Sequence, residues 1–160
     1  SGVVTGVNAV QRTIRVTPDS PVAPAVLKAL EGSVVHFANN RRRTAHTISS
    51  AKMDGKDLLL TTRDDLLTGR ARITESQPRL LTTPTPFEFA AIYTGAFVAD
   101  SSLTEFAPVS LVDAKGIHLL EPLNALVKDQ DVWMVNVGPG DRLECPASFS
   151  WSEAKKAGIP

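Results

Sequence analysis

The sequence predicts an all-β protein: an antiparallel β-sandwich with one short connecting helix or, as the alternative, a β-barrel. Two observations lead to this class. Short runs of apolar residues and threonine alternate with loops rich in Asn, Arg, Asp and Gly, and the expected strands recur at intervals of roughly 8–12 residues. Only residues 25–31 show a helical pattern before the C-terminus. The 160 residues can bury a core without disulfides or metal, so we expect one module over 3–152 and a tail at 153–160.

The N-terminal part predicts strands at residues 3–7 and 12–17. In the second of these, Ile14 and Val16 alternate with polar residues, which is typical of a half-buried strand. Three prolines then interrupt the pattern.

The expected helix, residues 25–31, is short. Val26, Leu27 and Leu30 share one of its faces, and Gly32 follows as a stop signal. We expect it to connect two strands across one end of the fold.

The segment from Gly32 to Glu75 predicts a β-meander. Its charged clusters fall in turns, and Asp54-Gly55 is typical of a tight hairpin that needs a positive φ. The expected strands are 33–38, 45–51, 57–62 and 70–75.

The second half begins with a linker at residues 77–86, where three prolines argue against a central strand. The expected strands that follow are 87–93, 96–99, 109–113, 116–121, 124–128, 132–137 and 142–151. Within the last turn, Gly138-Pro139-Gly140-Asp141 lacks the Lys-Ser/Thr ending of a phosphate-binding loop, so we expect a tight turn in which Asp141 bonds its own backbone.

The composition limits the partners. Lys+Arg and Asp+Glu both number 17, which argues against nucleic acid as a partner, and no apolar run is long enough for a membrane span. Cys145 is the only cysteine, so no disulfide framework and no multi-cysteine zinc site is expected.

Two histidines flank the Asn39–Arg43 loop. The stretch resembles the region of cupredoxins where a strand ending in Asn precedes a ligand histidine, and His36 and His46 could face each other across a hairpin. A blue-copper site needs two histidines, a cysteine thiolate and usually a weak axial ligand. In that family the cysteine, the second histidine and a methionine follow in a late loop, whereas no histidine follows Cys145 here. We therefore predict no metal and no cofactor.

The run Thr44-Ala45-His46 resembles the segment before the catalytic histidine of chymotrypsin-like proteases. Asp64 or Asp65 and then Ser148 or Ser150 would complete the order of a triad. Neither serine lies in a glycine-flanked loop that could form an oxyanion hole. No catalytic residue is therefore assigned, and a small serine hydrolase using His46 is kept as an alternative.

Three adjacent arginines give the most conspicuous charge cluster. At a loop tip, Arg41, Arg42 and Arg43 could bind carboxylates or sulfates of an acidic sugar chain. The alternative is a solvated turn whose charge is compensated by Asp64-Asp65.

Aromatic residues make up 6% of the chain, and sugar-binding modules use exposed aromatics for stacking. Trp133 lies in an apolar run that suggests burial, whereas Trp151 ends a predicted strand. The predicted ligand-binding residues are Arg41, Arg42, Arg43, His46 and Trp151.

The chain resembles the C-terminal β-sandwich region of heparinase-like polysaccharide lyases and related secreted carbohydrate-active proteins. The matching segments are GVVTGVNAVQRTIRV, ALEGSVVHFANN with RRRTAHTISSAKMDGKDLLLTT, and DVWMVNVGPGDRLECPASFSW. The catalytic residues of that family lie largely outside this region. The resemblance implies a noncatalytic module, secreted or at the cell surface, with an acidic polysaccharide or a larger parent enzyme as partner.

The leading hypothesis is thus an accessory module that could bind acidic glycan. An all-β structural or assembly domain, as in viral capsids and spikes, is an alternative that would self-associate.

Overall fold

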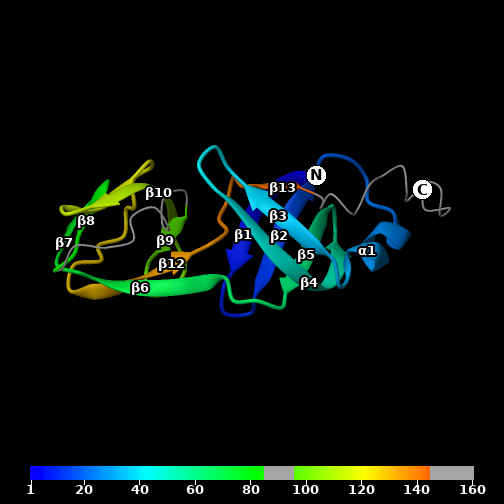
Figure 1. The fold of residues 1–160 in the computed structure, drawn as a ribbon, viewed down its shortest axis with the longest axis horizontal. Helices are drawn as coiled ribbons and strands as arrows, with labels where there is room; N and C mark the ends of the chain where they lie inside the picture. Colours follow the sequence, from blue (N-terminus) through cyan, green and yellow to red (C-terminus); the bar gives the residue numbers. More distant parts are fainter. Residues whose placement is uncertain (85–95, 145–160) are drawn as a thin grey trace. The chain divides into compact units, whose positions relative to one another are not determined.

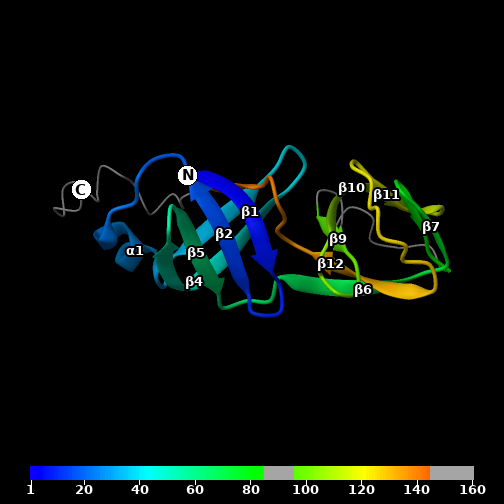
Figure 2. The ribbon, with the colours of Figure 1, turned by 180° about the vertical axis from the view of Figure 1, so that it is seen from behind.

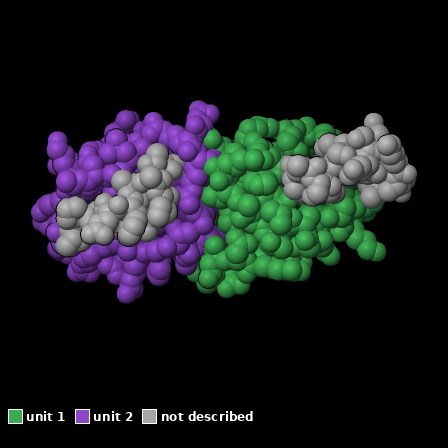
Figure 3. All heavy atoms as spheres, viewed as in Figure 1, with its two compact units in different colours: residues 1–39, 43–65, 139–160 green, residues 40–42, 66–138 purple. Residues whose placement is uncertain are grey.

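The computed structural model describes residues 1–84 and 96–144, and these are mostly β-strand, with one helix in that part of the chain (Figure 1). The all-β prediction is confirmed. Chain contacts divide the protein into two compact units, coloured in Figure 3: unit 1 comprises residues 1–39, 43–65 and 139–160, and unit 2 residues 40–42 and 66–138. The sequence predicted one module over 3–152, but residues 40–42 and 66–138 within that range belong to a second unit. The expected tail 153–160 lies outside the described residues.

Unit 1 is a closed antiparallel barrel, seen from opposite sides in Figures 1 and 2. Unit 1 therefore takes the barrel form that the sequence left as the alternative. Its strands, in the order in which they neighbour one another, are β1 (Gly2–Asn8), β13 (Arg142–Glu144), β3 (Val34–Ala38), β4 (Arg43–Asp54), β5 (Asp57–Thr62) and β2 (Thr13–Pro18), which closes on β1.

The barrel interior follows the period-two pattern of its strands. Ile14 and Val16 of β2 are fully buried, as their alternation predicts, and Leu58 and Leu60 of β5 face the same core. The expected hairpin is confirmed, because Asp54 pairs with Asp57 and Gly55 has φ +64°. Only β3, β4 and β5 of the predicted meander are consecutive neighbours, since the next strand belongs to unit 2.

The helix α1 (Pro24–Leu30) agrees with the predicted helix to within one residue. Pro24 occupies a first-turn position, where its missing N–H costs no hydrogen bond. Val26 and Leu30 are buried, and α1 packs against β4. Gly32 follows the helix with φ +81° and donates its N–H to the Ile48 carbonyl at 2.7 Å.

Unit 2 is built on a seven-stranded antiparallel sheet. Its strands, in spatial order, are β6 (Leu67–Ile73), β12 (Gln130–Val135), β9 (Phe97–Ala99), β10 (Phe106–Asp113), β11 (Gly116–Leu119), β8 (Leu80–Thr82) and β7 (Glu75–Gln77). Its core includes Ile73, Val98, Val109, Val132 and Met134.

Two sequence predictions in unit 2 are wrong. The expected linker 77–86 contains β8 and the end of β7, because Pro78 falls in the turn between these strands, where no ladder hydrogen bond is needed. Residues 124–128 form no strand. Their apolar pattern is that of a core-covering loop, from which Leu123 and Val127 enter the core.

Two further strand predictions fall partly or wholly outside the described residues. Segment 87–93 is one, and the part of 142–151 beyond Glu144 is the other.

Candidate functional site

The outward face of β6 and β12 in unit 2 carries one aromatic residue and two arginines. Val132 and Met134 of β12 belong to the core, so Trp133 between them points to the opposite face of the sheet. Trp133 pairs directly with Arg70 of β6, which places both side chains on that outward face. The prediction that Trp133 is buried is wrong, because this side chain is only half-buried.

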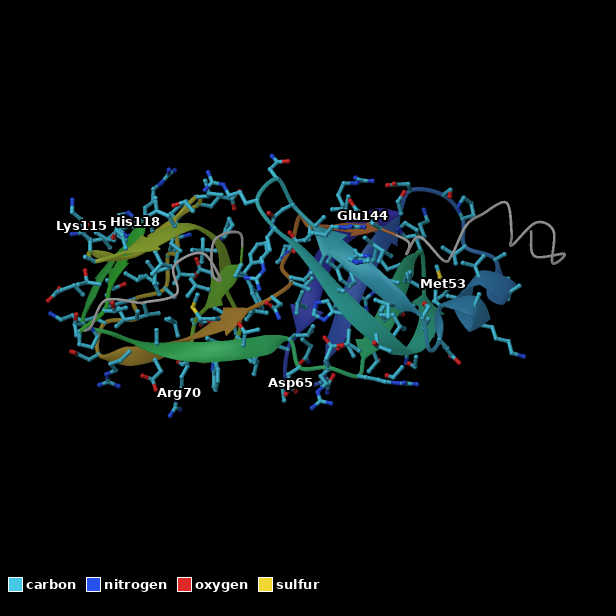
Figure 4. All side chains as sticks on the ribbon, viewed as in Figure 1. Met53, Asp65, Arg70, Lys115, His118 and Glu144 are labelled. Atoms are coloured by element: carbon cyan, nitrogen blue, oxygen red, sulfur yellow. The ribbon has the colours of Figure 1, made fainter. Side chains whose placement is uncertain are left out.

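Two arginines line this face. Arg70 and Arg72 are two residues apart on β6, so they share one side of the strand. Their side chains are 65% and 57% exposed. Figure 4 shows Arg70 extending away from the sheet. We call the surface formed by Arg70, Arg72, Asp131 and Trp133 the Trp133 face.

Asp131 is the acidic member of the Trp133 face. It pairs with Arg72 in the strand register. Its carboxylate oxygens lie 3.7 Å from an Nη1 of Arg70 and 3.8 Å from that of Arg72. A flat ring flanked by cations and by one acceptor can stack on a sugar ring and bind an anion at the same time.

The sequence contains a signal for this face that the prediction did not use. In Val-Trp-Met-Val, Val132 and Met134 cannot share a face with Trp133 in a strand. The run Arg70-Ala71-Arg72 has the same alternation. The pairing of β6 with β12 was not predictable, because the 56 residues from Thr74 to Asp129 separate these strands in the chain.

The three arginines of the predicted glycan-binding loop have different partners. Arg41 donates to the Ser110 carbonyl and Arg42 to Asn136 Oδ1, each at 2.7 Å and each within unit 2. Arg43 lies in β4 and pairs with Glu144 at 2.9 Å within unit 1. These guanidinium groups therefore make hydrogen bonds within the protein, and two of them do so in a different unit from the third.

The proposed charge compensation by Asp64-Asp65 is wrong. Asp65 pairs with Arg12 at 2.7 Å, and Asp64 contacts His46. Both carboxylates hold the segment after β5 against other parts of the barrel, instead of neutralising the arginine cluster.

His46 is the most enclosed of the predicted site residues that the structure describes, with 2% of its side chain exposed. Its Nδ1 contacts an oxygen of Asp64, and its Nε2 lies 3.2 Å from the Thr44 hydroxyl. The other Asp64 oxygen accepts the Thr47 N–H at 3.2 Å. The structure thus brings His46 and Asp64 together as the triad hypothesis required, with the hydroxyl of Thr44 on the second nitrogen. Ser148 and Ser150 lie outside the described residues.

The two histidines do not face each other. Val35 pairs with His46 and His36 pairs with Ala45, so the register places the imidazoles on opposite faces of the β3–β4 hairpin. His36 and His46 therefore cannot share a metal ion as the sequence suggested. No group of three or more metal-ligating side chains occurs among the described residues.

Asp141 in the last turn is buried and accepts the Asn39 side-chain N–H at 3.0 Å. The turn also joins the barrel: the Asp141 carbonyl accepts the Val4 N–H, and the Gly140 N–H is donated to the Val4 carbonyl, both at 2.8 Å. The backbone of Gly140 and Asp141, directly before β13, is therefore held by hydrogen bonds to Val4 of β1.

Trp151, the remaining predicted ligand-binding residue, lies outside the described residues. No helix in the described part of the chain has the length and apolar character needed to cross a membrane. Comparisons with protein-family models, with curated proteins and with solved structures find no match to this chain.

Proposed function

We propose that the protein is a noncatalytic β-module that binds an acidic glycan through the Trp133 face. One observation supports this proposal above the others: the register that pairs Trp133 with Arg70 puts Trp133 on the same outward sheet face as Arg70 and Arg72, whose side chains are more than half exposed. The resemblance to the β-sandwich region of heparinase-like lyases points to the same class of ligand. A secreted or cell-surface location would follow from that ligand.

The chemistry of the Trp133 face fits a sugar ring with an anionic substituent. The indole offers an apolar surface to the C–H face of a pyranose, and arginine forks bind carboxylate or sulfate with two donors each. The predicted loop of Arg41, Arg42 and Arg43 is less suited to this role, because its guanidinium groups already bond within the protein.

The test is affinity electrophoresis in gels that contain chondroitin, or chondroitin whose carboxylates have been reduced to alcohols. We expect chondroitin to slow the migration of the protein and the carboxyl-reduced form not to slow it. Trp133→Ala and the double variant Arg70→Gln/Arg72→Gln should each weaken binding by about tenfold or more. Residues that dominate the binding energy of other interfaces have effects of this size.

The matched control is Lys52→Gln/Lys56→Gln, which removes the same charge from exposed positions of unit 1. This control should bind like the unmodified protein. A separate Arg41→Gln variant reports on the predicted loop. Equal retardation of the Trp133→Ala variant and the unmodified protein would reject the Trp133 face as the site.

A second candidate is hydrolysis by Thr44, because His46 lies between its hydroxyl and the Asp64 carboxylate. A fluorophosphonate probe tests it: labelling that disappears in Thr44→Val would support a nucleophile, and an unlabelled protein would exclude this candidate.

A further inference from the structure

We propose that Asp131 makes the Trp133 face selective for acidic chains of low charge density, with free hydroxyls and widely spaced anions, over densely sulfated ones. This inference rests on the proposed function and adds to it a class of ligand and the residue that selects it.

The strand register places the charge of Asp131 within the Trp133 face. Arg72 lies directly opposite it on β6, and Trp133 follows two residues along β12 on the same face. A ligand that stacks on Trp133 and reaches Arg70 or Arg72 therefore passes close to the Asp131 carboxylate.

The distances show how Asp131 acts. Its oxygens lie 3.7 and 3.8 Å from the two guanidinium nitrogens, beyond the range of about 2.7–3.2 Å for an N–H···O hydrogen bond. Asp131 therefore lowers the positive potential of both arginines through space and leaves their N–H donors available. Its side chain is 37% exposed, so it can also accept hydrogen bonds from a ligand.

Two effects then separate the ligand classes. A single carboxylate of the ligand can bind one guanidinium on the side away from Asp131. Closely spaced sulfates instead place a second anion close to the Asp131 carboxylate. The repulsion grows with each added charge. Free sugar hydroxyls can donate to Asp131, and sulfation removes these donors.

The experiment compares chondroitin with chondroitin sulfate, which share a backbone and differ in charge density. Dissociation constants are measured at constant ionic strength for the unmodified protein and for Asp131→Asn. We expect the variant to shift the affinity ratio toward the sulfated chain by about threefold to fivefold, the size of one exposed charge interaction in water. The shift should shrink as salt is added.

The matched control is Asp129→Asn, which removes one negative charge two residues away. Asp129 forms no ion pair among the described residues, and its φ of +61° is tolerated by Asn as well as by Asp. This control should change the ratio by less than half as much. An unchanged ratio in Asp131→Asn, or weaker binding of both chains, would overturn the inference while leaving the proposed function intact.

Absence of binding to either chain would instead refute the proposed function. The role of Asp131 is then decided by titrating inorganic sulfate against sodium chloride and following the Arg70 and Arg72 Nε–H signals by NMR. Tighter sulfate binding by Asp131→Asn supports Asp131 as the residue that opposes dense negative charge. Equal or weaker binding rejects it.

Discussion

Gly138 packs directly against the face of Phe97 in unit 2, and a β-carbon built on Gly138 would lie 2.4 Å from atoms of that ring. Phe97 is 4% exposed and belongs to β9, so its ring has little room to move. The contact explains why glycine occupies position 138 in the segment that leads from β12 to β13.

The first prediction concerns this contact. Gly138→Ala should destabilise unit 2 by about 1–3 kcal/mol, the usual cost of overpacking a core. Hydrogen exchange of peptides from β9 and β12 measures it. Gly6→Ala is the control, because a β-carbon there meets no atom closer than 3.9 Å, and it should leave exchange in unit 2 unchanged. Equal protection of β9 in Gly138→Ala and the unmodified protein would contradict the packing argument.

The second prediction concerns Asp100, whose carboxylate orders the loop between β9 and β10. It accepts N–H groups of Thr104 and Glu105 at 2.7 and 3.0 Å and the Thr104 hydroxyl at 2.7 Å. Burial acts to raise the pKa of Asp100, but the hydrogen bonds from Glu105 and Thr104 together lower it below its ordinary value.

The sign of the pH effect follows from that lowered pKa. Asp100 stabilises unit 2 above the pKa that its carboxyl has in the unfolded chain, and this stability is lost as pH falls through the folded-state pKa. At neutral pH, Asp100→Ala should lower the free energy of unfolding by about 1–3 kcal/mol. In a plot of the urea-unfolding midpoint against pH, the midpoint of the variant should fall less steeply on the acid side than that of the unmodified protein. If the midpoint of the variant falls with decreasing pH as steeply as that of the unmodified protein, other carboxylates cause the loss of stability in acid.

The barrel strands show what the sequence could predict. Alternation in Thr13–Thr17 and the Asp54-Gly55 turn are local signals, so β2 and the β4–β5 hairpin were expected where they occur. The Trp133 face was not expected, because it depends on which strand lies beside β12. Periodicity assigns a residue to one side of a strand but does not identify the neighbouring strand.

The errors at residues 77–86 and 124–128 have a common physical cause. Proline excludes a ladder donor only at its own position, so β7 and β8 can flank Pro78. Apolar residues enter a core from loops as well as strands when other groups satisfy the loop backbone. Here the Glu105 carboxylate accepts the N–H groups of Asn124 and Ala125 at 2.6 and 2.9 Å.

The third prediction concerns the β10–β11 hairpin, whose residues Lys115 and His118 are labelled in Figure 4. His118 Nε2 lies 2.8 Å from Asp113 Oδ1, and this hydrogen bond is the largest cause of the lowered pKa of Asp113. His118→Ala should move the pKa of Asp113 back toward its ordinary value, because only the backbone donors of the turn remain. Carboxyl NMR titration measures this change. Lys115→Ala, which keeps its backbone N–H, should have a smaller effect, and an unshifted titration in His118→Ala would refute the assigned cause.

The fourth prediction separates a structural from a catalytic role of the His46–Asp64 contact. Asp64→Ala removes the acceptor of both His46 Nδ1 and the Thr47 N–H, and leaves the Nδ1 of a ring that is 2% exposed without its partner. We expect a loss of about 1–3 kcal/mol in the unfolding free energy of unit 1, the cost of an unsatisfied buried polar group.

Asp65→Ala is the matched control, because it removes the adjacent carboxylate. The ion pair of Asp65 with Arg12 contributes at most about 1 kcal/mol, since the Asp65 side chain is 70% exposed and that of Arg12 is 45% exposed. Urea unfolding followed by exchange in β4 and β5 compares the two variants. Equal losses would mean that the imidazole does not depend on Asp64. A variant that keeps its stability but loses fluorophosphonate labelling would instead favour catalysis at Thr44.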